Sequence, residues 1–303
     1  MSTRVTQNML NQNMLYNLSR TNSAMEKYQD QAASGKKINK PSDDPVTAVR
    51  GMYFRSSLNE IDQYKRNVDD GLSWMTSTDD ALDEVNSVLQ RVRELTVQGL
   101  NGTNDDSARS AIAEEISQLK EHIGEIANTQ IAGRYIFAGT DVKNPPYRTN
   151  SGDPSSVKEF RNTNQEKLEL QVGQTNNVQI NTPGTEVFNK NINGDGGIFG
   201  VLSDIVSKLK SGELTSDSLS QLDGQIDNVL TKRSEIGARM NRMELSQSRL
   251  EGLVVSTTSL LSNEEDADLS QVIINLKAEE NVQRAALSVG ARIIQPSLVD
   301  FLR

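Results

Sequence analysis

Few residues of this 303-residue chain combine the type and the spacing that catalysis requires. His122 is the only histidine, and cysteine is absent, which excludes disulfide bonds, thiolate nucleophiles and cysteine-ligated metals. The chain also lacks the H-E-x-x-H zinc motif, the G-x-S-x-G nucleophile turn and the phosphate-binding P-loop. We interpret His122 as a structural residue on the flank of a helix, and we predict neither enzymatic activity nor a cofactor.

Residues 189–200, NKNINGDGGIFG, begin like a calcium-binding loop, with Asn at the first, third and fifth positions followed by Gly. The twelfth position is Gly200, however, where such loops carry a bidentate Glu, and amides stand where carboxylates are needed. A glycine-rich turn explains this segment more simply, so we predict no metal site in it.

Two acidic clusters remain, one at Asp43 and Asp44 and the other in residues 264–268, EEDAD. Paired carboxylates can bind a divalent cation or transfer protons. Both clusters, however, lie where long helical segments are interrupted, and acidic residues at such places cap and solvate helix ends. We therefore assign them to the ends of helices and turn to the elements that surround them.

Composition excludes two classes of protein. The chain is 35% hydrophobic and 24% charged, with mean hydropathy -0.55, and no apolar run approaches the roughly 20 residues that span a bilayer. A net charge of -9 and a pI near 4.9 argue against nucleic-acid binding, which needs clustered Lys and Arg. We predict no nucleic-acid partner, no membrane insertion and, from the polar N-terminal segment, no cleaved secretory signal.

Three segments carry apolar residues at the heptad spacing of packed helices. In residues 46–98 the repeat runs through Ile61, Val68 and Met75, beside which we interpret Trp74 as a packing residue. Residues 106–130 follow a break with Asn104 or Asp105 as a candidate N-cap, and we expect them to return antiparallel. The third and most regular repeat begins at Leu219 and reaches Leu261.

Residues 131–200 differ in character, because Gly, Asn, Thr and Pro dominate and apolar residues alternate in EKLELQV and NVQI. We therefore predict a mainly α protein with a β-rich insert, an α+β fold. Its domains would be a helical segment of residues 1–44 and 262–303, helices at 45–130 and 200–261, and the insert at 131–199.

Both ends of the chain are predicted amphipathic helices, and the ends carry opposite net charges, which permits them to pair. Their apolar residues have few other partners in the chain, so we expect an assembly interface with neighbouring subunits. The candidate interface residues are Leu10, Met14, Leu18, Met25, Ile273, Leu276, Leu287 and Ile294.

A joint separates the N-terminal helix from the next one. Pro41 and Pro45 each fix φ, remove a backbone donor and push the preceding residue out of the α region. Asp44 suits an N-cap and Pro45 a first helical position, while Asp43 belongs to the same turn. Residues 261–270, LSNEEDADLS, form the matching joint on the return, with a capping box predicted at Ser262 and Glu265.

Three blocks resemble bacterial flagellins: SGKKINKPSDDPVTA, LQRVRELTVQGLNGTN and RSEIGARMNRMELSQSRL, in this order. Val46 and Thr47 depart from the small pair usual in the first block. The segment NTQIAGRYIFAGTDV and the ending PSLVDFLR are similar to the junction proteins of that family, which join hook and filament. The resemblance implies an elongated rod with nested terminal helices, a β domain at the far end, and terminal helices that assemble.

The resemblance also implies partners and a location: a ring of the chain's own copies, hook-associated protein 1, flagellin and an export chaperone, in the extracellular flagellum. Export would leave the chain uncleaved. Two alternatives stay open. One is a filament flagellin, which polymerises in many copies; the other is a cytosolic coiled-coil binding module that shares only the heptads.

Overall fold

The computed structural model describes residues 7–101, 105–148, 159–192 and 196–294. Its contacts divide the chain into a terminal unit, Met1–Glu60 with Leu253–Arg303, and a central unit, Ile61–Gly252. The helices are α1 (Gln7–Ser34), α2 (Pro45–Leu100), α3 (Asp106–Ala127), α4 (Gly184–Val187), α5 (Gly197–Ser211), α6 (Ser216–Glu265) and α7 (Leu269–Ile294). The strands are β1 (Gln130–Ile131), β2 (Arg134–Tyr135), β3 (Tyr147–Arg148), β4 (Glu159–Phe160), β5 (Glu169–Gly173) and β6 (Asn176–Gln179).

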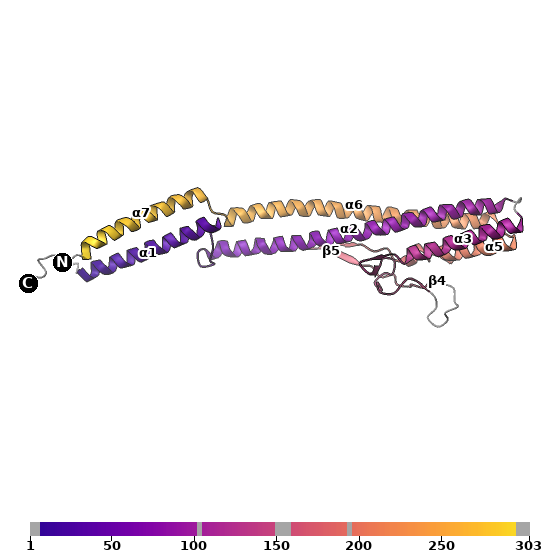
Figure 1. Cartoon of the computed structure of the whole chain (residues 1–303), viewed down its shortest axis with the longest axis horizontal. Helices are drawn as coiled ribbons and strands as arrows, with labels where there is room; N and C mark the ends of the chain where they lie inside the picture. Colours follow the sequence, from indigo (N-terminus) through magenta and orange to yellow (C-terminus); the bar gives the residue numbers. More distant parts are fainter. Residues whose placement is uncertain (1–6, 102–104, 149–158, 193–195, 295–303) are drawn as a thin grey trace, which may run out of the picture. The chain divides into compact units, whose positions relative to one another are not determined.

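The central unit is built on α2, which packs antiparallel against α6 and α3 (Figure 1). Arg233 binds Asp79, while Gln247 binds Asp69, so the α6 number rises as the α2 number falls. The predicted antiparallel return of residues 106–130 is confirmed in the same way, because Arg91 binds Glu115 while Glu84 lies beside His122.

The heptad residues form the core of this unit, as predicted. Members of all three repeats are buried, and Trp74 packs among them with 8% of its surface exposed. The fully buried residues of the repeats are Val68, Met75, Leu82, Leu89, Ile116, Ile123, Leu222, Val229 and Met243. Burial of the repeat positions, rather than helix propensity, is what stabilises helices this long.

The region that was predicted to be helical after residue 200 consists of two helices. α5 ends at Gly212, whose φ of 75° is the left-handed conformation that ends many helices, and α6 begins at Ser216. α5 packs on α3 and buries Ile205 and Leu209. The heptad pattern starting at Leu219 therefore belongs to α6, and the preceding apolar residues serve a second, separate helix.

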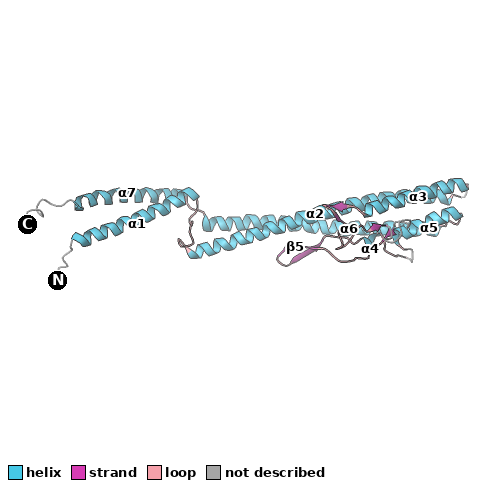
Figure 2. Ribbon diagram, turned by 60° about the horizontal axis from the view of Figure 1, so that its bottom comes forward, coloured by secondary structure: helices cyan, strands magenta, loops and turns pink. Residues whose placement is uncertain are grey.

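The predicted β-rich region consists of three antiparallel hairpins, β1 with β2, β3 with β4 and β5 with β6 (Figure 2). The alternating segments correspond to β5 and β6, in which Leu170 pairs with Val178. Aromatic rings join the hairpins to the helices: Phe137 lies 5.0 Å from Phe188, and Tyr147 stacks at 5.0 Å on Phe199 of α5. The fold class is confirmed as mainly helical with a small β region.

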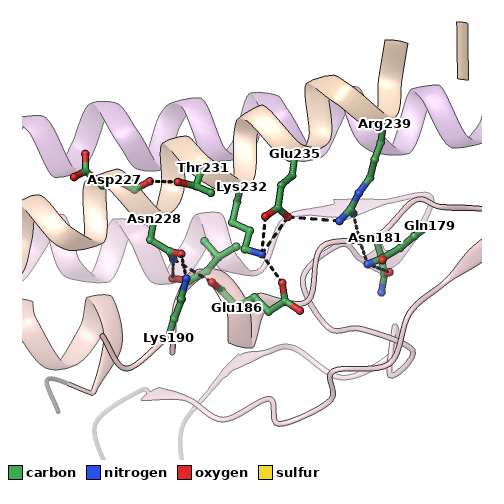
Figure 3. A network of polar contacts seen from close by, with 11 residues as sticks. Gln179, Asn181, Glu186, Lys190, Asp227, Asn228, Thr231, Lys232, Glu235 and Arg239 are labelled. Carbon is green, nitrogen blue, oxygen red and sulfur yellow. Dashed lines mark hydrogen bonds and ion pairs between the residues drawn. The ribbon is translucent and has the colours of Figure 1, made fainter. Parts of the chain in front are cut away.

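A polar network anchors the β region to α6 (Figure 3). The Lys232 ammonium lies 2.7 Å from Glu186 and 3.1 Å from Glu235, and Arg239 donates to the carbonyl of Asn181. Burial opposes the charged form of Lys232, but the hydrogen bonds and negative charges of the two carboxylates raise its pKa above the ordinary value. The network thus fixes the β region at one register of α6.

In the terminal unit, α1 and α7 lie side by side and antiparallel (Figure 1). Gln283 donates to Asn22 at 2.8 Å, and Gly290 packs on Met14 nearer the start of α1. The predicted pairing of the two ends is confirmed. Within the described part of the chain, no helix has the length and apolar character that a bilayer crossing requires.

Two predicted caps are confirmed and one is wrong. Asp44 accepts from the amides of Val46 and Thr47 at the start of α2, and Asp105 caps α3. Ser262 does not start a helix, because α6 continues through it to Glu265. The cap of α7 is instead Asp268, which accepts from the backbone of Ser270 and Gln271.

Candidate assembly site

The apolar residues of α1 and α7 fall into two sets, one half-buried and one exposed. Met14, Leu18 and Met25 of α1 are half-buried against α7, and so is Leu276 of α7. A side-chain carbon added at Gly290 would collide with Met14, so the helices approach closely there. These four predicted interface residues therefore hold the pair together before any neighbour is present.

Other apolar residues of α1 and α7 are exposed. Ile273 and Leu287, both predicted interface residues, are 52% and 51% exposed. Sequence reasoning missed five further exposed apolar residues of the two helices, because each lies beside or between the stripe positions of its helix. They are Leu15, Tyr16, Ile274, Val282 and Val289, which are 51–69% exposed. Binding another subunit would remove these apolar side chains from water, which favours association.

Two predicted residues lie at the outer ends of the pair. Leu10 belongs to α1 and Ile294 to α7, but their side chains fall outside the described part of the structure. Together, the exposed residues Leu15, Tyr16, Ile273, Ile274, Val282, Leu287 and Val289 make up what we call the outer face.

The two predicted joints contact one another. The amide of Lys37 donates to the carbonyl of Glu265 at 2.6 Å, and the amide of Ala267 donates to the carbonyl of Gly35 at 2.9 Å. Lys36 and Asp266 form an antiparallel bridge between these hydrogen bonds. The segment after α1 and the segment before α7 are thus joined as a short strand pair. This pair connects the C-terminal end of α1 to the N-terminal end of α7, and we refer to the two paired helices as the α1–α7 hairpin.

Glu265 is the polar centre of this joint, a role different from the capping box in which the sequence placed it. Only 10% of its side chain is exposed. Its carboxylate binds Arg55 of α2 and lies 3.3 Å from the Lys36 ammonium. A side chain at Gly51 would occupy the space of that carboxylate, so the glycine admits Glu265 to the surface of α2. One carboxylate therefore connects three segments.

Asp43 and Asp44 shape the turn between α1 and α2. Asp43 accepts from the amides of Lys40 and Asn39, and these bonds lower its pKa from the ordinary value. The hydroxyl and amide of Thr47 lower the pKa of Asp44.

Pro41 lies exposed in the turn and Pro45 is the first residue of α2. This is the turn that was predicted at the joint, and its carboxylates accept hydrogen bonds from backbone amides.

His122 lies on the surface of α3, where its Nε2 is 3.2 Å from Glu84 of α2. Among the described residues, no three His, Asp or Glu side chains are grouped in a way that would hold a metal ion. The calcium-like residues 193–195 lie outside the described residues, and Gly196 and Gly197 beside them have positive φ, as a turn requires.

Comparisons with known proteins identify the family. The bacterial flagellin N-terminal helical region matches residues 5–141, and the bacterial flagellin C-terminal helical region matches residues 219–302. The chain is 27% identical to a flagellin of Bacillus subtilis over 308 aligned residues, covering 96% of each protein. It is 25% identical to flagellar hook-associated protein 3 of Escherichia coli, covering 88% of this chain and 90% of that one.

Among solved structures, a putative flagellar hook-associated protein from Vibrio parahaemolyticus is similar with a TM-score of 0.65 and 22% identity, over 74% of this chain and 100% of that one. This match shows the fold alone. The likeness to hook-associated protein 3 that the sequence predicted is confirmed by these comparisons. With both helical regions matched across most of its length, the chain belongs to the bacterial flagellin family, whose members are structural proteins of the flagellum rather than enzymes.

Proposed function

We propose that this chain is the junction subunit that connects the hook to the flagellin filament. The observation that carries the proposal is the outer face of α1 and α7, a set of large apolar side chains that are at least half exposed. A subunit that meets one kind of neighbour on the hook side and another on the filament side needs such a surface at its ends. Copies of the chain would form a ring, with hook-associated protein 1 and flagellin as the two neighbours.

The proposal assigns a role to each part of the chain. Residues 1–44 and 262–303 form the assembly segment, residues 45–130 and 200–261 form the helical outer layer, and residues 131–199 form the β-rich insert. The joint centred on Glu265 fits this division, because it closes the α1–α7 hairpin where the assembly segment begins. The chain leaves the cell uncleaved through the flagellar exporter, held beforehand by an export chaperone.

Filament flagellin is the second candidate, and the similarity to the Bacillus subtilis flagellin over 96% of both chains favours it. The GRYIFAGT segment favours the junction role. In the structure this segment forms β2 and the start of the aromatic core, where Ile136, Phe137 and Ala138 are fully buried. The segment thus determines how the β region attaches to the helices.

Deleting the gene separates the two candidates. A junction subunit is needed for filaments to attach but not for flagellin to be made, so we expect bare hooks and unassembled flagellin in the culture medium. A filament flagellin would also leave bare hooks, but the medium would then contain no flagellin. Attached filaments in the deletion strain would contradict both roles.

A further inference from the structure

Methionine holds all of the sulfur in this chain, which has eight methionines and no cysteine. The methionine thioether accepts an oxygen atom from a peroxide and becomes a sulfoxide, which is polar where the thioether is apolar. Met75 and Met243 are fully buried in the core of the central unit, whereas Met9 and Met52 are exposed. Oxidation changes a structure where the sulfur is both accessible to the oxidant and part of a contact between helices.

Met14 of α1 meets both conditions. Its side chain is half-buried, so part of it stays open to a small oxidant such as hydrogen peroxide. The rest lies on α7, where a carbon atom added at the buried Gly290 would be 2.8 Å from the Met14 sulfur. Ordinary van der Waals contact is about 3.5–4.0 Å, so the thioether occupies the space in which a side chain at 290 would begin. The atom that oxidation changes is therefore the atom that lies on the α7 backbone.

The surroundings of Met14 are poorly suited to a sulfoxide. The sulfoxide oxygen is a hydrogen-bond acceptor, and burying it without a donor is costly. Asn11, one helical turn before Met14, already has a buried side-chain oxygen to which no described residue donates. Met240 on α6 provides the contrast, because the hydroxyl of Thr76 donates to its sulfur at 3.9 Å and could serve a sulfoxide oxygen. Oxidation should therefore cost more at Met14 than at Met240.

We propose that Met14 is an oxidation site and that its sulfoxide separates α1 from α7. The Met14 sulfur gives two electrons to hydrogen peroxide and takes one of its oxygen atoms, while the other oxygen leaves as water. Two thiols reverse the step, because they are oxidised to a disulfide and release the sulfoxide oxygen as water. Loss of the packing on Gly290 destabilises α1, since helices in proteins are stabilised mainly by such packing.

Met25 provides a comparison within the same helix pair. It is also half-buried on α1, but none of the described glycines is packed against it. We therefore assign the sensitivity to Met14. The oxidation and the loss of pairing do not depend on where the chain lies in the flagellum. Weaker assembly of the oxidised chain, through displacement of the outer face, is the one consequence that rests on the proposed function.

Peroxide treatment of the purified full-length chain tests the site, with mass spectrometry of its peptides and amide hydrogen exchange as the two measurements. We expect Met14 to gain one oxygen atom well before the buried Met75 and Met243 do. Amide exchange in α1 should then become at least about tenfold faster, while exchange in α3 stays unchanged. Dithiothreitol with the two methionine sulfoxide reductases, one for each sulfoxide epimer, should restore the slow exchange.

Variants separate Met14 from the other methionines. Met14→Leu removes the sulfur at nearly constant volume and should keep exchange in α1 slow after peroxide, whereas Met25→Leu should respond as the unmodified chain does. Met14→Gln introduces a polar group without an oxidant and should speed exchange in α1, while Met9→Gln, at an exposed position of the same helix, should not.

Three results would overturn the proposal. The first is slow exchange in α1 when Met14 is oxidised, and the second is slow exchange in Met14→Gln. The third is an equal response to peroxide in Met14→Leu and in the unmodified chain.

Discussion

Glu265 at the end of α6 forms an ion pair with Arg55 of α2, from which it is separated by 210 residues in the chain. The carboxylate is nearly buried and also meets Lys36, while the backbone of residue 265 accepts from Lys37. The side chain and main chain of one residue therefore hold together the segment after α1, the start of α2 and the return to α7. This joint determines how firmly the α1–α7 hairpin is closed.

Glu265→Gln should loosen the joint without changing the helices. The substitution removes the charge that pairs with Arg55 and Lys36, at a cost of about 1–2 kcal/mol because both cations are partly exposed. Amide hydrogen exchange at Lys37 and Ala267 should become faster. Glu264→Gln is the matched control, since the Glu264 carboxylate pairs with the exposed Arg50. Equal effects from the two variants would show that Glu265 is an ordinary surface acid.

Leu287→Asp should abolish assembly and leave the fold unchanged. The side chain is 51% exposed, so the charge costs little in the free subunit but much in an apolar contact with a neighbour. Circular dichroism should match the unmodified chain, while motility and filament attachment are lost. Ser288→Asp, at the adjacent exposed position, is the control.

Leu276→Asp should have the same effect on attachment and should also weaken the α1–α7 pair, because Leu276 is half-buried within it. We therefore expect faster amide exchange in α1 for Leu276→Asp but not for Leu287→Asp. Normal motility in both leucine variants would refute the assembly site.

Asp105→Ala should destabilise the central unit by about 1 kcal/mol, the usual cost of losing an N-cap. The side chain of Asp105 accepts a hydrogen bond from the amide of Ala108 at 2.8 Å and so caps the N-terminus of α3. Ser107→Ala, in the same turn, should change the free energy of unfolding little. Thermal unfolding of the two variants gives the comparison, and an unchanged midpoint for Asp105→Ala would contradict the assigned cap.

The turn between α1 and α2 should weaken only in acid. Hydrogen bonds lower the pKa of Asp43 and Asp44 in the folded chain, so their contribution is complete above the unfolded pKa, near 3.9, and is lost as the pH falls through the lower folded values. Protease cleavage within residues 39–44 should be constant from about pH 5 to 8. It should rise below about pH 4.

Asp43→Asn and Asp44→Asn together should remove that acid step. If the double variant and the unmodified chain respond to acid alike, other groups govern the turn.

The helices were predictable because their signals are local and repeated. Heptads in α2, α3 and α6 mark the buried faces, and Pro45, Asp44 and Asp105 mark helix starts that the structure reproduces. The break between α5 and α6 was missed because apolar residues continue on both sides, although Gly212 was the available signal. The capping box at Ser262 failed because α6 continues through it to Glu265, whose carboxylate pairs with Arg55 of α2.

The interior of the joint could not be predicted, because it depends on contacts between distant residues. The local spacing marks Glu265 only as a capping-box residue, and nothing in it predicts that the Glu265 side chain is more buried than that of Glu264. The same limit applies to the outer face: adjacent apolar residues such as Met14 and Leu15 both fit an amphipathic helix, and only the position of α7 decides which one is exposed.

The most direct test of the junction role is immunogold electron microscopy of flagellated cells, with an antibody raised against residues 145–185. These residues lie within the β-rich insert, which the proposed arrangement leaves accessible on the assembled subunit. We predict gold confined to one point between hook and filament. Gold along the whole filament would contradict the junction role and make this protein a filament flagellin.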